Sequence, residues 1–72
     1  MKVTIEYWVQ WNFKPQALTV KGELEKHNPN LDVSLIEGGG GIFEVKQDNL
    51  LLFSKKAVGR FPNPGEIPGL LT

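Results

Sequence analysis

The chain has 72 residues, which suffice for one small domain and are too few for two separate hydrophobic cores. Apolar residues make up 40% of the sequence and charged residues 22%, a composition typical of a folded domain rather than a disordered one. Eight basic residues balance eight acidic ones. This balance argues against binding to nucleic acid or to an anionic membrane through excess positive charge.

The sequence has no cysteine, and His27 is its single histidine. It therefore offers no disulfide, no thiolate ligand for zinc and no thiol chemistry. We expect no metal, nucleotide or prosthetic group. The longest apolar run, residues 50–53, is far shorter than the ~20 residues that span a bilayer. The charged Glu6 does not suit the apolar region of a signal peptide, so we expect a cytoplasmic protein.

Residues 2–7 alternate between polar and apolar side chains, which predicts a strand with one buried face. Pro15 is typical of a first helical turn, because proline loses no hydrogen bond there. Apolar residues then recur at helical spacing, at Ala17, Val20 and Leu24. Pro29 ends this predicted helix near His27, since the residue before a proline is disfavoured in the α conformation.

Three further strands are predicted over residues 31–35, 42–46 and 50–54. Asp48 and Asn49 suit a tight hairpin turn between the last two. The tail from Gly59 holds too many Pro and Gly residues for more than one short helical turn. The polar residues of the first three strands would share one face of the sheet. The β-α-β-β-β order therefore predicts a single α+β domain over residues 1–72, a two-layer sandwich with a mixed four-stranded sheet and a short irregular C-terminal tail.

Three segments, taken together, resemble the selenoprotein W-related (Rdx) family, whose members have a thioredoxin-like fold. In the first, Val-Thr-Ile-Glu-Tyr at residues 3–7 is followed after four residues by Asn-Phe-Lys-Pro. The second holds Gly-Ile-Phe-Glu-Val at residues 41–45 and Leu-Phe-Ser-Lys-Lys at residues 52–56. The third is Gly-Arg-Phe-Pro at residues 59–62. The resemblance implies a lineage of thiol or selenol oxidoreductases that act in cell redox homeostasis.

The chain departs from the family pattern at the redox pair. Family members place Cys-x-x-Cys, or Cys-x-x-selenocysteine, directly after the tyrosine of the first strand, where this chain has Trp8 and Trp11. In the family the helix N-terminus favours a thiolate, and the second residue resolves a mixed disulfide. An indole can do neither, so the resemblance implies a redox-inactive protein with no catalytic residue. The family's long C-terminal helix is also missing or very short, which would leave part of the sheet uncovered.

Two origins of Trp8 and Trp11 are open. One is a natural paralogue or variant that lost its thiols and kept a surface. The other is a decoding event or a deliberate substitution, because the tryptophan codon differs by one base from the selenocysteine codon and from both cysteine codons.

The two tryptophans lie three residues apart at the predicted strand–helix junction, and packing of both indoles in the core is one interpretation. The buried face of the first strand is already supplied by Val3, Ile5 and Tyr7, so we expect at least one indole to be exposed as a contact surface for protein. Its partner would be another protein or a second copy of the chain, and neither nucleic acid nor a membrane. The expected binding residues are Val9, Gln10, Asn12, Phe13, Lys14, Gly40, Gly41 and Phe61. An alternative function is a small interaction module or homodimer with no redox role.

Other features have simpler interpretations. The glycines at residues 38–41 predict a flexible loop between strands rather than a phosphate cradle, because a strand pattern and not a helix follows them. The resemblance would place this loop, and Phe61, beside the redox-motif positions. His27 suits the C-terminal end of the helix. Lys55 and Lys56 are interpreted as a solvated strand end.

Overall fold

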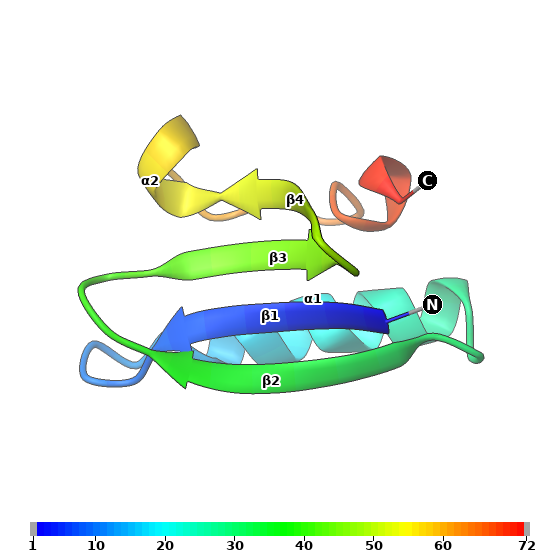
Figure 1. Ribbon diagram of the computed structural model, residues 1–72, viewed down its shortest axis with the longest axis horizontal. Helices are drawn as coiled ribbons and strands as arrows, with labels where there is room; N and C mark the ends of the chain where they lie inside the picture. The colour runs from blue at the N-terminus through cyan, green and yellow to red at the C-terminus, as the bar shows by residue number, and fades with distance from the viewer. Residues whose placement is uncertain (1, 72) are drawn as a thin grey trace.

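The computed structural model describes residues 2–71. Its elements are β1 (Lys2–Trp8), α1 (Lys14–His27), β2 (Asp32–Gly38), β3 (Phe43–Gln47), β4 (Leu50–Ser54), α2 (Lys55–Val58) and the 3-10 turn η1 (Pro68–Leu70). The strands form one sheet in the order β2-β1-β3-β4 (Figure 1). β1 and β2 run parallel, whereas β1–β3 and β3–β4 are antiparallel. The predicted α+β class, element order and mixed four-stranded sheet are confirmed.

One face of the sheet carries the polar side chains, as predicted. Thr4 of β1 lies between Ser34 of β2 and Lys46 of β3, and Glu6 lies opposite Glu44 of β3. The intervening residues of β1 are buried on the other face. Because side chains alternate along a strand, this register gives β1 to β3 a mostly polar face opposite the face directed to the core. The exposed Ile36 lies beside Glu6 and the exposed Leu51 beside Lys46 on that face.

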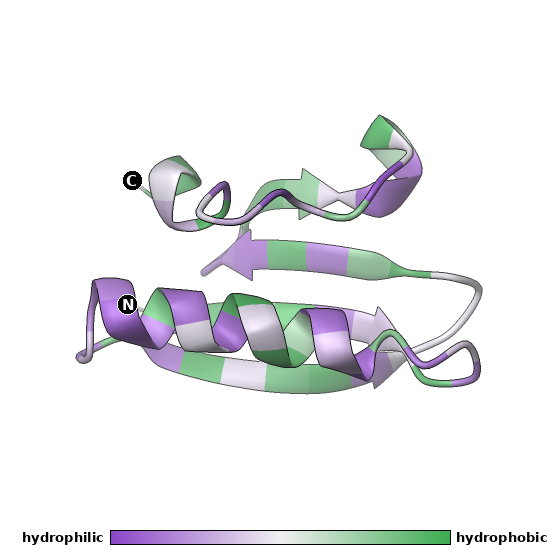
Figure 2. Ribbon diagram, turned by 180° about the vertical axis from the view of Figure 1, so that it is seen from behind, coloured by the Kyte–Doolittle hydropathy of each residue, from purple (hydrophilic) through white to green (hydrophobic). Residues whose placement is uncertain are grey.

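α1 covers the core face over β1 and β2 (Figure 2). It buries Ala17, Val20 and Leu24, which recur with the helical period. The helix begins at Lys14, so Pro15 lies in its first turn, where a missing N–H costs no hydrogen bond. Within residues 2–71, no helix combines the length and the apolar character needed to cross a membrane.

β2 extends three residues beyond its predicted end, to Gly38, which pairs with Trp8 of β1. A Cβ at Gly38 would lie 2.6 Å from Ile42 Cγ2 and 2.8 Å from Glu6 Oε2. Glycine at position 38 therefore lets the side chains of Ile42 and Glu6 approach the strand. The loop expected at residues 38–41 is displaced by one residue, to 39–42.

The chain after β4 differs from the prediction. Lys55 and Lys56 begin the short helix α2, so their interpretation as a strand end is wrong. Ser54 precedes α2 in an extended conformation, and Gly59 ends it at a φ of 79°, in the left-handed region that favours glycine. Gly59 is the local signal that ends this turn, whereas the Ser54 hydroxyl makes no cap hydrogen bond and donates to Glu44 Oε2 at 3.2 Å.

The tail, residues 59–71, packs on the core face beside α1, along the β4 side of the sheet (Figure 2). Ile67 is fully buried in the core, and Phe61 and Leu71 pack against it. The tail therefore covers the region that the lack of a long C-terminal helix was expected to leave open.

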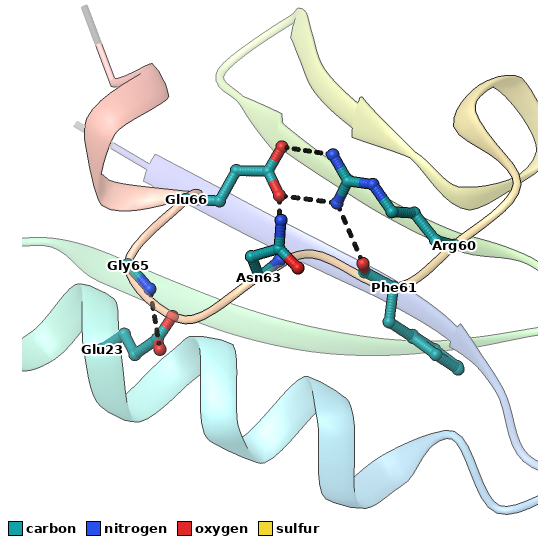
Figure 3. Close-up of polar contacts among 6 residues, drawn as sticks. All are labelled: Glu23, Arg60, Phe61, Asn63, Gly65 and Glu66. Atoms are coloured by element: carbon teal, nitrogen blue, oxygen red, sulfur yellow. Dashed lines mark hydrogen bonds and ion pairs between the residues drawn. The ribbon is translucent and has the colours of Figure 1, made fainter.

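Polar contacts fix the path of this tail (Figure 3). The Arg60 guanidinium donates to both carboxylate oxygens of Glu66, at 2.8 and 3.1 Å, and the Asn63 backbone N–H donates to Glu66 Oε1 at 2.9 Å. The hydrogen bond from Arg60, reinforced by that from Asn63, lowers the pKa of Glu66 to about 2. The Gly65 N–H donates to Glu23 Oε2 at 3.1 Å and so ties the tail to α1.

Candidate functional site

The loop between β1 and α1 forms one wall of the candidate site. Asn12 has a φ of 57°, a left-handed conformation that asparagine tolerates better than most residues. Its N–H donates to the Val9 carbonyl at 3.2 Å, and the Phe13 N–H donates to the Trp8 carbonyl at 3.3 Å. This tight turn brings Trp11 back onto Trp8, with ring centroids 5.1 Å apart and planes tilted by 35°.

The two indoles differ in burial. Trp11 is 74% exposed, whereas Trp8 is half-buried and packs against the core. Trp8 also meets the ring of Phe13 edge-on, at a centroid distance of 5.9 Å. The expectation of at least one exposed indole is confirmed by Trp11, and the interpretation that both pack in the core is wrong for that residue.

The glycine loop, residues 39–42 between β2 and β3, lies on the other side of Trp8. The Trp8 N–H donates to the Ile42 carbonyl at 2.9 Å, and a Cβ on Gly41 would lie 3.8 Å from Trp8 Cε3. Gly40 and Gly41 have φ values of 66° and 77°, which favour glycine. The loop leads into β3 and not into a helix, so it lacks the loop-to-helix arrangement of a phosphate cradle.

A row of rings continues from Trp8 into the core. Phe13 meets Phe61 at 4.9 Å, and Phe61 meets the fully buried Phe43 at 5.2 Å, both edge-to-face. Lys55 Nζ lies 5.6 Å from the ring centre of Phe13 and 5.3 Å from that of Phe61. Sequence reasoning missed Lys55, because no local pattern signals that residues 13, 55 and 61 meet in space.

The predicted binding residues fall into two groups. Those of the first group are exposed and lie in the β1–α1 loop, at the start of α1 or in the glycine loop: Val9, Gln10, Asn12, Lys14 and Gly40. Gly41 is half-buried against Trp8, Phe13 meets the ring of Trp8, and Phe61 packs behind Phe13. Lys56 lies near the glycine loop, since a Cβ on Gly40 would be 3.9 Å from its Nζ.

Two solved structures share this fold. A selenoprotein W-related protein from Vibrio cholerae superposes with a TM-score of 0.90 at 22% identity, covering 96% of this chain and 89% of that protein. A protein from Bordetella parapertussis gives a TM-score of 0.82 at 22% identity, covering 96% and 90%. No curated protein matches the sequence.

The sequence pattern of the Rdx family matches residues 2–71. The matched region includes β1, α1, the glycine loop and the tail, so the likeness extends well beyond the segment that carries the tryptophans. Because the chain has no cysteine, it cannot form the thiolate or disulfide on which thiol redox chemistry depends. The match over residues 2–71 shows that the chain belongs to the Rdx family.

Proposed function

We propose that this Rdx protein binds another protein through its indole surface and performs no thiol or selenol redox chemistry. The indole surface comprises Trp8, Trp11 and the two loops at residues 9–13 and 39–42. The observation that carries the proposal is the 74% exposure of Trp11, whose ring packs at a tilt against that of Trp8. Tryptophan is among the residues most enriched at binding hot spots, because its large ring gains much from removal from water.

The geometry of the indole surface favours binding. Trp8 packs against the core and fixes one side of Trp11, so a partner would lose less side-chain freedom in ordering it. Val9, 44% exposed, extends the apolar area within the same loop. Lys14 and Lys56 lie at its margins and make no ion pair with the described residues. An apolar centre with a charged margin is the usual anatomy of a protein interface.

A second copy of the chain is the partner that can be tested directly. We expect sedimentation velocity to show concentration-dependent association of the wild-type chain. Trp11→Ala should weaken it by at least about thirtyfold, the equivalent of a hot-spot loss of roughly 2 kcal/mol. The matched control is Leu50→Ala, which removes a side chain that is 52% exposed at the opposite end of the sheet. A wild-type chain that stays monomeric, or equal association of Trp11→Ala and wild type, would contradict self-association through this surface.

A further inference from the structure

A groove between α1 and the tail lies apart from the exposed indole. It has a volume of about 180 Å³. Its apolar walls are Pro15, Val20, Phe61, Pro62 and Pro64. Pockets that hold whole drug-sized ligands measure roughly 300–1,000 Å³. The size of this groove therefore suits one extended side chain better than a complete small-molecule ligand.

Four polar side chains line the groove: Gln16, Thr19, Glu23 and Asn63. The carbonyl oxygen of Gln16 is closed off from solvent and has no hydrogen-bond partner among residues 2–71. The Thr19 hydroxyl donates its proton to the Pro15 carbonyl at 2.9 Å, which leaves its lone pairs available. Glu23 accepts the Gly65 N–H through one carboxylate oxygen. Asn63 adds an amide that can both donate and accept.

The charge of Glu23 is not neutralised by a cation within the described residues. Lys21 pairs with Glu25 and Arg60 pairs with Glu66, so the charges of these two cations are already matched by other carboxylates. Figure 3 shows the Glu23 carboxylate directed to the tail and the Phe61 ring directed towards α1. The groove thus combines apolar walls with an unneutralised carboxylate and a hydroxyl whose lone pairs are available, which together suit a cation with several donors on an apolar stem.

We propose that this groove binds the arginine side chain of a partner polypeptide. A guanidinium has several N–H donors and no acceptor, which complements the Thr19 hydroxyl and the Glu23 carboxylate. Its aliphatic stem can pack on the proline-rich walls. Lysine fits less well, because its ammonium is more strongly hydrated and has only three donors. Since Lys55 already lies 5.3 Å from the ring centre of Phe61, the guanidinium is expected at the Glu23 end of the groove.

The test is an NMR titration of the full, ¹⁵N-labelled chain with N-acetyl-arginine N-methylamide. The matched ligand is the citrulline analogue, which has nearly the same shape and no charge. We expect saturable shifts of the amides of Thr19, Val20 and Asn63 with arginine, in the millimolar range, and much weaker shifts with citrulline. Propylguanidinium, which lacks the peptide backbone, should bind more weakly than the blocked arginine.

Two variants localise the effect. Glu23→Gln keeps an oxygen for the Gly65 N–H and should weaken arginine binding roughly two- to fivefold, as expected for a partly exposed ion pair. Glu25→Gln, on the exposed side of α1, should leave the affinity unchanged. Spectra of both variants check that the fold is retained. Equal binding of arginine and citrulline, no saturable shift, or no effect of Glu23→Gln would overturn the proposal, and equal binding of propylguanidinium would overturn its assignment to a polypeptide.

Discussion

α1 and the tail cover neighbouring parts of the same sheet face by different means (Figure 2). α1 is regular and buries three apolar residues at helical spacing. The tail is irregular and has one fully buried side chain, Ile67, with Phe61 and Leu71 partly buried beside it. Its course is held by the bidentate contact of Arg60 with Glu66 and by the bond from Gly65 to Glu23.

The difference shows two ways to close a small core. A helix satisfies its own backbone hydrogen bonds, so side-chain periodicity alone decides which face it buries. An irregular segment must satisfy its backbone and fix its path through particular side chains. The tail should therefore respond to the loss of a single anchor or a single polar contact more locally than α1 does.

The largest effect is expected in the core beneath α1. Leu24→Ala should lower the free energy of unfolding by about 3 kcal/mol, because it removes a fully buried side chain and leaves a cavity. Leu18→Ala, on the same helix but 49% exposed, should change it by less than about 0.5 kcal/mol. Urea unfolding followed by circular dichroism measures both. Equal losses would contradict the assignment of the buried face.

Ile67→Ala should lower the free energy of unfolding somewhat less, by about 2 kcal/mol, because an irregular segment can partly collapse into the cavity that the substitution leaves. Hydrogen exchange of the backbone amides locates the loss. Protection should fall most within the tail and least within α1. Leu70→Ala, which truncates a 38% exposed side chain nearby, serves as the control. A uniform loss of protection across the sheet and α1 would show that the tail is not a separate unit.

Replacing two of the glycines by alanine should change the stability of the fold in opposite directions. Gly59 has a φ of 79° at the entry to the tail, so Gly59→Ala should destabilise the fold by about 1 kcal/mol. Gly22 lies exposed within α1, and the position that an alanine methyl group would take there is open space. Gly22→Ala should therefore stabilise the fold by roughly 0.5–1 kcal/mol. Thermal unfolding of the two variants measures the signs. Two shifts of the same sign would refute the contrast.

The smallest expected effect is the pH dependence of the stability that Glu66 contributes. The pKa of Glu66 falls from 4.5 to about 2 in the folded protein, chiefly through its hydrogen bond from Arg60. A lowered folded-state pKa contributes stability above pH 4.5, and this contribution is lost as the pH falls towards about 2. The difference in unfolding free energy between wild type and Glu66→Gln should therefore be present at pH 6 and be mostly lost near pH 2. A difference that is constant across this range would refute the linkage.

The parts of the fold that sequence could predict follow from local patterns. Alternation identified β1, the helical stripe identified α1, and Asp48 takes the positive φ, 54°, expected in the β3–β4 hairpin. The tail could not be predicted, because no repeat spacing signals the contact of Arg60 with Glu66 six residues on, or the placement of Ile67 in the core.

The candidate site shows the same division. The exposure of at least one indole was expected because the buried positions of β1 were already taken, but the alternation did not indicate that the exposed indole would be Trp11 rather than Trp8. By contrast, Lys55 between Phe13 and Phe61, and the groove at Glu23, depend on contacts between residues far apart in sequence. Such contacts form only once the fold has brought the residues together, so a local sequence pattern does not predict them.

The most direct test of the central claim, a family scaffold whose sulfur pair is replaced by indoles, is the activity of the double variant Trp8→Cys/Trp11→Cys. Turnover of a model disulfide in the presence of a thiol reductant is compared between this variant and the wild-type chain, with circular dichroism confirming that both are folded. We expect measurable turnover by the cysteine variant and only the uncatalysed rate with the wild type. A folded variant that remains inert, or a wild-type chain that turns over the disulfide, would contradict the account.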